Sequence, residues 1–448
     1  MKSLEKSVLK GSLWTTGGYG MAQVLRFLNN VVLARLLAPE LFGLMVLVNT
    51  LLMGLELFSD IGVGQSIVQN EKGNEADFLN TAWTLQIIRS IFLFLICGLL
   101  APFVADFYEQ SSLAPLIIAS SANLLLTGIT STSISSLRRN LQQARLNVYG
   151  LTMQALGLGA TIIWAIIDPS VWALVGGGLV GNTIRAVSSH FLIPNYRNRI
   201  VLKQAYIAEI INYGKWVFIT SITVFLAQQT DRIVLGKLVP LDMLGVYGIA
   251  RALSDIFRNL TLKLGNEIVF PYIARLTNLD HSQLRSQLAG SRQKFLWVAL
   301  ALLSIPVTFG DWAVQLLYDE RYFAATWMVC VLCFGVWFAI LSQIGDATMR
   351  GIGKPAYSAQ ANVVKLGLLM IGLPWSYKAF GIAGCIVITA VSELSGYLSL
   401  QYVLFRENLL FLKQDILTTT AFVLLVAVLV LLRSQLGFGT PWDNFFQS

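Results

Sequence analysis

Long apolar runs recur along the whole chain, and short polar stretches separate them. Each run has about 20 predominantly apolar residues, which is enough for a helix to cross the hydrocarbon core of a bilayer. The pattern therefore predicts an all-α polytopic membrane protein. The expected spans are residues 12–36, 41–64, 82–108, 113–137, a run that ends at Asp168 and Pro169, 171–193, 213–238, 241–264, 295–318, 323–348, 358–379, 381–405 and 416–432.

The span at 241–264 differs from the others because it carries Arg251, Asp255 and Arg258. These residues are four and then three positions apart, so they share one face of a helix. A charged residue at the centre of a membrane helix costs about 2.5–3.5 kcal/mol on insertion scales. We therefore expect this face to contact other helices or a hydrated cavity, and charges at membrane depth are a functional hypothesis by default.

Neighbouring spans carry further charges. Asp231 and Arg232 lie in the outer half of the span before the charged one, and Arg26, Glu56 and Asp60 lie in the first two spans. Arg89 and Arg185 are weaker candidates, since each lies near an inner end where a long side chain can extend to the interface.

The two halves of the chain repeat each other. Pro39 and Pro240 each follow a span with polar residues, and the alignment places Asn49 on Arg251 and Glu56 on Arg258. Both halves begin on the same side, so the repeat is parallel, about an axis along the membrane normal. The predicted organisation is a six-helix half at 1–194, an amphipathic cytoplasmic linker at 195–212, a six-helix half at 213–405, and an extra span with a tail at 406–448.

The composition supports a membrane protein and offers no metal site. The chain is 55% hydrophobic and 12% charged, whereas soluble domains are about 25% charged. Cys330 and Cys333 form a C-x-x-C on an apolar span with no histidine nearby, so helix packing is favoured over redox or zinc chemistry. No cofactor is expected.

The distribution of lysine and arginine predicts the orientation. With a cytoplasmic N-terminus, most basic residues fall in inner loops, and only five fall at outer ends: Arg35, Lys237, Arg321, Lys378 and Arg433. This is the positive-inside pattern. The net charge of +8 therefore reflects topology rather than nucleic-acid binding. We expect a protein of the inner (plasma) membrane, without a cleavable signal peptide.

Two interpretations of the charged face stay open. Arg251, Asp255 and Arg258 can form a charge network that joins helices, with Asp255 as the partner of either arginine. Alternatively the surplus positive charge forms an anion site, because a guanidinium binds phosphate through two parallel hydrogen bonds.

Several segments resemble the bacterial polysaccharide and O-antigen flippases of the multidrug/oligosaccharidyl-lipid/polysaccharide exporter superfamily. They are Gly11-Ser-Leu-Trp14, Leu36-Leu-Ala-Pro-Glu-Leu-Phe-Gly43, Asp60-Ile-Gly62 and Arg350-Gly-Ile-Gly-Lys-Pro355, and the likeness covers residues 5 to 405. The resemblance implies two parallel, pseudo-symmetric six-helix bundles that form a V-shaped transporter, here with one extra C-terminal helix.

The resemblance also implies a function. Such a protein moves undecaprenyl-pyrophosphate-linked oligosaccharide to the outer leaflet by alternating access, for O-antigen, capsule or exopolysaccharide synthesis. Basic groups line the cavity of the family and serve the anionic head group; here these are Arg26, Arg251 and Arg258. Asp231 and Arg232 are the other candidates for the substrate-binding cavity. Coupling to H⁺ or Na⁺ is implied as well, with Glu56, Asp60 and Asp255 as the candidates. The implied partners are lipid-linked oligosaccharide, membrane lipids and other polysaccharide-assembly proteins, with no nucleic acid.

Two alternatives remain. A cation-coupled drug exporter of the same superfamily would have an acidic, aromatic cavity, whereas this chain has surplus arginine. A membrane polysaccharide polymerase or ligase would be an enzyme with a large outer loop, and every predicted outer loop here is short. The sequence motifs do not choose among glycans, coupling ions, oligomeric states or the two sides of the membrane for the C-terminus.

Overall fold

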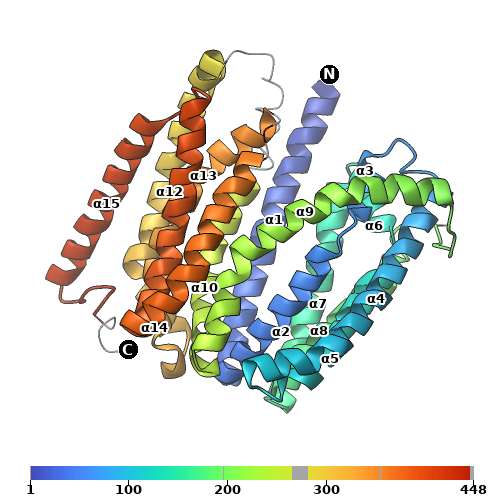
Figure 1. Cartoon of the computed structure of the whole chain (residues 1–448), viewed down its shortest axis with the longest axis horizontal. Helices are drawn as coiled ribbons and strands as arrows, with labels where there is room; N and C mark the ends of the chain where they lie inside the picture. The colour runs from blue at the N-terminus through green and yellow to red at the C-terminus, as the bar shows by residue number, and fades with distance from the viewer. Residues whose placement is uncertain (1, 195, 265–280, 353, 355, 444–448) are drawn as a thin grey trace. The chain divides into compact units, whose positions relative to one another are not determined.

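The structure is a computed structural model that describes residues 2–194, 196–264, 281–352, 354 and 356–443. These residues form α-helices joined by short connections, as predicted (Figure 1). The chain divides into two compact units, Met1–Phe225 (unit 1) and Leu226–Ser448 (unit 2). The division falls inside a single long helix, whereas the sequence placed the linker between halves at 195–212.

Unit 1 contains eight complete helices in its described part. Within it, α4 packs on α5, α7 packs on α8, and the two pairs meet where α5 contacts α8, while α1 lies on α7 (Figure 1). The helices are α1 (Lys2–Leu36), α2 (Pro39–Phe58), α3 (Val63–Gln69), α4 (Ala76–Tyr108), α5 (Leu113–Ile129), α6 (Ser133–Arg139), α7 (Gln143–Ile167) and α8 (Val171–Ser189).

Unit 2 begins within α9 and is built around α13, which packs on α10, α12 and α14. The last helix, α15, lies against α12. The helices are α9 (Gln204–Leu238), α10 (Leu241–Leu264), α12 (His281–Leu317), α13 (Ala325–Gly351), α14 (Ala356–Arg406) and α15 (Leu412–Gln435), with a short 3₁₀ helix, η2 (Glu320–Tyr322).

Every predicted span overlaps one or two of these helices. The 51 residues of α14 would extend about 75 Å if straight, far more than the roughly 30 Å of a hydrocarbon core. The helix instead turns at Gly381, whose φ of 61° is the left-handed conformation that favours glycine. The turn separates the predicted spans 358–379 and 381–405.

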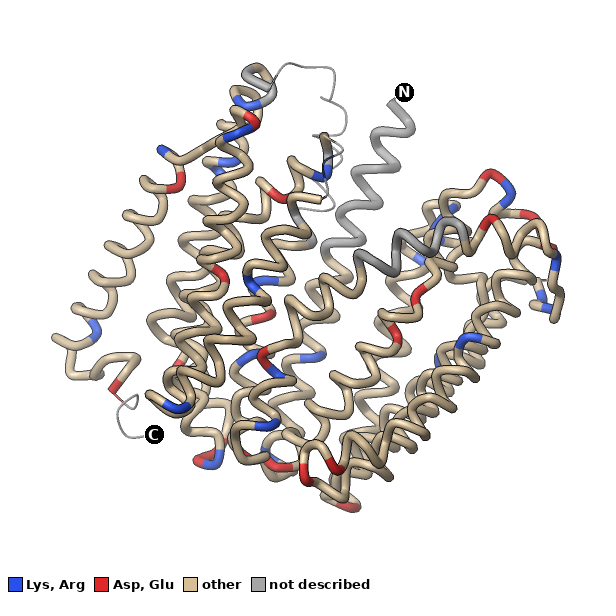
Figure 2. The backbone as a smooth tube through the Cα atoms, viewed as in Figure 1, with Lys and Arg blue, Asp and Glu red and all other residues tan. Residues whose placement is uncertain are grey.

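Two predicted spans are shorter than expected. The span at 41–64 ends at Phe58, and the span at 113–137 breaks after Ile129, where α5 and α6 meet at 55°. In the described residues, seven helices are individually long and apolar enough to cross a membrane, or eight when the bent pair counts as one span. Figure 2 shows most charges at helix ends and a smaller group within the helices.

Two buried ion pairs hold α15 in unit 2. Near its start, Asp415 accepts a hydrogen bond of 2.5 Å from Arg292 on α12. Near its end, Arg433 donates to both carboxylate oxygens of Asp311, also on α12, at 2.7 and 2.5 Å. All four side chains are at most 5% exposed. The extra C-terminal helix is therefore an integral part of unit 2.

Polar contacts also fix the start of α9 to unit 1. Lys72 and Asn70 donate to Glu209 at 2.6 and 2.9 Å, and Tyr206 donates to Glu75 at 2.7 Å. The hydrogen bonds from Lys72 and Asn70 lower the pKa of the Glu209 carboxyl below its usual value. The predicted amphipathic linker is thus helical from Gln204 onward and continues directly into the span that follows it.

Candidate functional site

Charged side chains gather where α9, α10 and α14 meet in unit 2. Helices α9 and α10 are joined at Val239 and Pro240, and Leu244 donates its backbone N–H to the Pro240 carbonyl at 2.9 Å. Asp231 and Arg251 lie within about three turns of this connection, so the two helices bring them to a similar depth. The resulting charge cluster contains four cations, Arg232, Arg251, Arg258 and Lys365, and three carboxylates, Asp231, Asp255 and Glu393.

Arg251 occupies the buried centre of the charge cluster. Its side chain is 5% exposed, and its Nε lies 3.6 Å from Asp231 Oδ2 and 3.4 Å from Asp255 Oδ1. The buried Tyr247 hydroxyl donates a hydrogen bond to Asp231. Arg251 is therefore enclosed by two carboxylates and joins α9 to α10.

Arg232, Asp255 and Arg258 form the more accessible edge of the charge cluster. Arg232 Nη2 lies 3.3 Å from Asp255 Oδ2, and both side chains are 22% exposed. Arg258 is 12% exposed, with its Nε 3.5 Å from Asp255 Oδ1. Arg258 also donates to Glu393. These three side chains are more exposed than that of Arg251.

Glu393 is the partner that the sequence did not assign. It accepts from Arg258 and, at 2.5 Å, from Lys365, and both Glu393 and Lys365 are 8% exposed. The sequence interpretation gave Asp255 as a partner of either arginine and added Glu56 and Asp60 from the second span. A signal was present, because Lys365 and Glu393 are isolated charges inside the apolar runs of the two spans that form α14.

The other predicted residues belong to unit 1. Arg26 lies exposed on α1, whereas Glu56 is exposed near the end of α2 and Asp60 follows that helix. Asp60 Oδ1 accepts the backbone N–H of Gly62 at 2.9 Å. Glu56 and Asp60 both line cavities of unit 1, and Arg26 lines neither of the two cavities described next.

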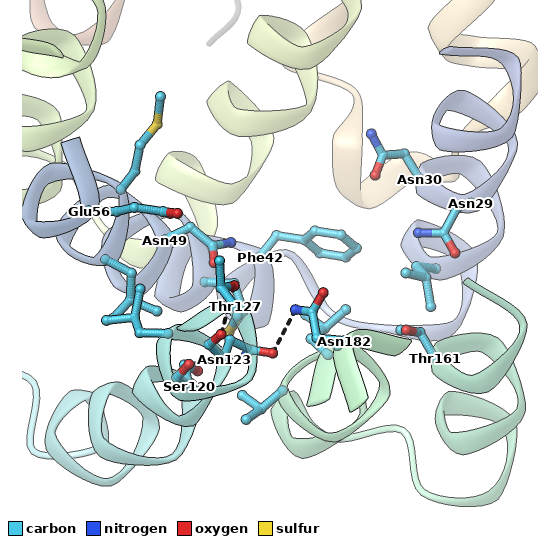
Figure 3. Close-up of a pocket in the computed structure, with 18 residues that line it drawn as sticks. Asn29, Asn30, Phe42, Asn49, Glu56, Ser120, Asn123, Thr127, Thr161 and Asn182 are labelled. Carbon is cyan, nitrogen blue, oxygen red and sulfur yellow. Dashed lines mark hydrogen bonds between the residues drawn. The ribbon is translucent and has the colours of Figure 1, made fainter. Parts of the chain in front are cut away.

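The first cavity, here called the amide cavity, has a volume of about 510 Å³ and is lined by α1, α2, α5, α7 and α8 (Figure 3). Phe42 is the one aromatic residue among the 18 that line it. Asn182 Nδ2 donates to Asn123 Oδ1 across it at 2.8 Å. Its polar lining consists of Asn29, Asn30, Asn49, Glu56, Ser120, Asn123, Thr127, Thr161 and Asn182.

The second cavity, here called the arginine cavity, has a volume of about 450 Å³ and adjoins the first. Glu56, Thr127 and Asn182 line both cavities. Arg89 on α4 and Arg185 on α8 supply its cations, and Asp60 supplies a further carboxylate.

Local contacts hold Arg89 in place. Its Nε donates to Ser59 Oγ at 2.9 Å and its Nη2 to the Glu56 carbonyl at 2.5 Å. From the sequence, Arg89 and Arg185 were weaker candidates that could extend to the membrane interface. The structure instead places both on the lining of a cavity.

Within the described residues, no group of three or more histidine, cysteine and acidic side chains is arranged to hold a metal ion. Cys330 and Cys333 are free and fully buried within unit 2.

The fold is that of MurJ- and MATE-type membrane transporters. The lipid II flippase MurJ in an inward closed conformation matches with a TM-score of 0.76 at 13% identity, over 93% of this chain and 92% of that chain. An inward-facing multidrug resistance transporter of the MATE family and MOP superfamily matches with a TM-score of 0.68 at 12% identity, over 86% of this chain and 94% of that chain. At such identities these similarities establish the fold alone.

The sequence comparison establishes the family. The polysaccharide biosynthesis protein family matches residues 32–331, and the chain belongs to it. The lipopolysaccharide biosynthesis protein WzxC of Escherichia coli strain K12 is 21% identical over 78% of this chain and 70% of its own length. The teichuronic acid biosynthesis protein TuaB of Bacillus subtilis strain 168 is 20% identical over 90% of this chain and 84% of its own length. A putative O-antigen transporter of Shigella flexneri is 19% identical over 89% and 98%.

The chain is therefore a multi-pass membrane transporter of polysaccharide biosynthesis rather than an enzyme. The resemblance to the flippases and the prediction of a helical membrane transporter are confirmed by these comparisons.

Proposed function

We propose that the protein is a flippase that moves undecaprenyl-pyrophosphate-linked oligosaccharide repeat units from the cytoplasmic to the outer leaflet of the plasma membrane. Two parallel, pseudo-symmetric six-helix bundles in a V-shaped arrangement would carry out the movement by alternating access. Family membership supports a role in surface polysaccharide synthesis. The names of relatives in O-antigen and teichuronic acid synthesis agree with it.

One observation favours an anionic lipid as substrate: the charge cluster of unit 2 holds more cations than carboxylates. All three of its carboxylates, Asp231, Asp255 and Glu393, lie within 4 Å of an arginine or lysine nitrogen. A cationic drug would need a carboxylate to pair with, and here each one is already neutralised. A diphosphate needs cations with spare hydrogen-bond donors, which Arg232 and Arg258 supply at the accessible edge.

The remaining predicted residues have separate roles in this proposal. Arg26 would contact the anionic head group from unit 1. Asp255 is the candidate for H⁺ or Na⁺ coupling in unit 2, and Glu56 and Asp60 are the candidates in unit 1. The N-terminus would be cytoplasmic, and membrane lipids and other polysaccharide-assembly proteins would be the partners.

The test uses the purified full-length protein in liposomes that contain undecaprenyl-diphospho-N-acetylglucosamine. An external galactosyltransferase with radiolabelled UDP-galactose modifies only the N-acetylglucosamine that faces outward. We expect the modified fraction to rise from about half to nearly all of the lipid, and to stay at half in liposomes without protein. A fraction that stays at half with protein present, together with efflux of a cationic dye from the same liposomes, would establish a drug exporter instead.

A further inference from the structure

We propose that the amide cavity and the arginine cavity of unit 1 form a two-part binding site that selects the charge of the first sugar. The amide cavity would bind a neutral or amino sugar, the arginine cavity would bind the diphosphate attached to it, and acidic sugars would be rejected. This inference rests on the proposed flippase function. It adds a substrate position in unit 1 to the anion site proposed for the charge cluster of unit 2.

The lining of the amide cavity matches the hydroxyl groups of a sugar. Each asparagine side chain offers one acceptor oxygen and two N–H donors, and a sugar hydroxyl both donates and accepts. The contact between Asn182 and Asn123 uses one donor and one acceptor, so both amides keep further capacity. Figure 3 shows these side chains, with Asn29, Asn30 and Asn49, directed toward one shared space.

Two buried polar atoms on this lining have no hydrogen-bond partner. They are Asn29 Oδ1 and the Ser120 hydroxyl, and Ser120 is 2% exposed. Buried polar groups in proteins are nearly always hydrogen-bonded, because leaving one unpaired is unfavourable. Both residues belong to the lining of the cavity, so this unmet hydrogen-bonding capacity lies at the proposed sugar site.

The charge of the amide cavity favours sugars without a carboxylate. Glu56 is the one ionisable side chain among its lining residues, and no lysine or arginine lines it. A uronic acid in the amide cavity would place a second carboxylate beside Glu56, on a lining that has no cation of its own. A neutral hydroxyl, an acetamido N–H or an ammonium group would instead donate a hydrogen bond to Glu56.

The arginine cavity lies where the diphosphate must be. The phosphate of a polyprenyl diphosphosugar is bonded directly to the first sugar carbon, so the two binding sites must adjoin. The two cavities share Glu56, Thr127 and Asn182, which meets this requirement. Arg89 and Arg185 come from different helices, and each guanidinium can donate two parallel hydrogen bonds to a phosphate. Both volumes, about 510 and 450 Å³, fall within the usual range for ligand sites of about 300–1,000 Å³.

The carboxylates that line the arginine cavity do not prevent Arg89 and Arg185 from binding a phosphate. Asp60 directs one oxygen to the backbone of Gly62. Glu56 lies at the border with the amide cavity, where the sugar would be.

The test measures binding of three probes to the purified full-length protein by isothermal titration calorimetry. The probes are farnesyl diphosphate, farnesyl-diphospho-N-acetylglucosamine and farnesyl-diphospho-glucuronic acid. The native protein should bind the N-acetylglucosamine probe at least tenfold more tightly than the glucuronic acid probe. Asn49→Ala and Asn123→Ala, at residues that line the amide cavity alone, should weaken binding of the N-acetylglucosamine probe about tenfold and leave binding of farnesyl diphosphate unchanged, whereas Arg185→Gln should weaken binding of all three.

Two further variants keep the test independent of folding. Glu56→Gln preserves the shape of the side chain and should reduce the discrimination against the glucuronic acid probe by tenfold or more. Thr152→Ala is the matched control: its hydroxyl donates only to the carbonyl of Val148 on the same helix, and it lines neither cavity. It should bind every probe like the native protein.

The possible failures are distinct. If the probes bind but sugar charge and the asparagine and Glu56 variants make no difference, the two-part site is wrong while the flippase proposal stands. If no diphosphate probe binds, and the liposomes show no translocation, the flippase proposal itself fails.

Discussion

Replacing Arg258 with alanine separates an anion site from a network that merely joins helices. Arg258 contacts Asp255 and Glu393. Without Arg258, Glu393 would still have Lys365 as a partner at 2.5 Å, and Asp255 would still have Arg232 at 3.3 Å. Removing one partner of a buried ion pair costs about 3–5 kcal/mol when the other charge is left alone. Because neither carboxylate is left alone here, we expect a smaller loss of stability and a variant that still inserts and folds.

The effect on substrate should be larger than the effect on folding. A charge-assisted hydrogen bond to a diphosphate contributes about 1.5–3 kcal/mol. At about 1.4 kcal/mol per decade, Arg258→Ala should weaken binding of undecaprenyl-diphospho-N-acetylglucosamine about ten- to a hundredfold. Arg258→Lys should restore part of this loss, since lysine keeps the charge but cannot form two parallel hydrogen bonds.

Arg251→Ala provides the contrast. Arg251 is enclosed between Asp231 and Asp255, and its loss leaves the 2%-exposed Asp231 with the hydroxyl of Tyr247 as its direct hydrogen-bond donor. We expect this variant to lose folded protein, with a fall in Tm well beyond that of Arg258→Ala.

The assay is galactosyltransferase accessibility in liposomes, normalised to folded protein, with Tm measured on the same preparations. The deciding variant is Arg258→Ala/Asp255→Ala. A pure helix-joining network predicts that removing both charges restores translocation, whereas an anion site predicts that it stays impaired. Normal translocation by the double variant would refute the anion-site reasoning.

Three further predictions concern the surrounding structure. Asp311→Ala leaves the buried Arg433 without its carboxylate and should cost about 3–5 kcal/mol of stability, seen as a lower Tm, whereas Asp311→Leu/Arg433→Met should recover most of it. In intact cells a cysteine at Asp168 should react with an impermeant thiol reagent and one at Asn140 should not; the reverse labelling would invert the proposed topology. The lowered pKa of Glu209, which lies on α9, makes its contact with Lys72 and Asn70 fully effective above the usual pKa of 4.5 and lost as pH falls through the lower folded value. Amide exchange at the start of α9 should therefore rise in that acidic range, and Glu209→Gln should abolish this pH dependence.

Hydrophobic patterning predicted most of the helices. The expected span at 241–264 coincides with α10. The charged residues in the middle of this helix lie on one face and apolar residues on the other, so the sequence alone assigned the charged face. The pattern located one break and missed another. The predicted spans 358–379 and 381–405 meet at the turn of α14 at Gly381, whereas the α5–α6 bend falls at Thr130, Ser131 and Thr132, inside the single span expected at 113–137.

The sequence predicted those parts of the candidate site that lie on a single helix, and it did not predict contacts between helices that are far apart in the chain. Arg251, Asp255 and Arg258 share a helix, so spacing alone grouped them. Glu393 lies 135 positions from its partner Arg258, and no periodic pattern connects two helices that far apart in the chain.

The amide cavity shows why some sites cannot be read from sequence at all. Its asparagines lie on α1, α2, α5 and α8, few on any one helix. Helical spacing groups Asn49 with Glu56 on α2, but no pattern connects them to the asparagines of the other helices. A single neutral amide in a membrane helix is also the usual sign of a hydrogen bond between helices. Only the fold shows that Asn29, Asn49, Asn123 and Asn182 line the same space. In the proposed two-part site, this dispersion means that a substitution on a single helix, such as Asn123→Ala, would change the sugar contacts from that helix and leave those from the other helices in place.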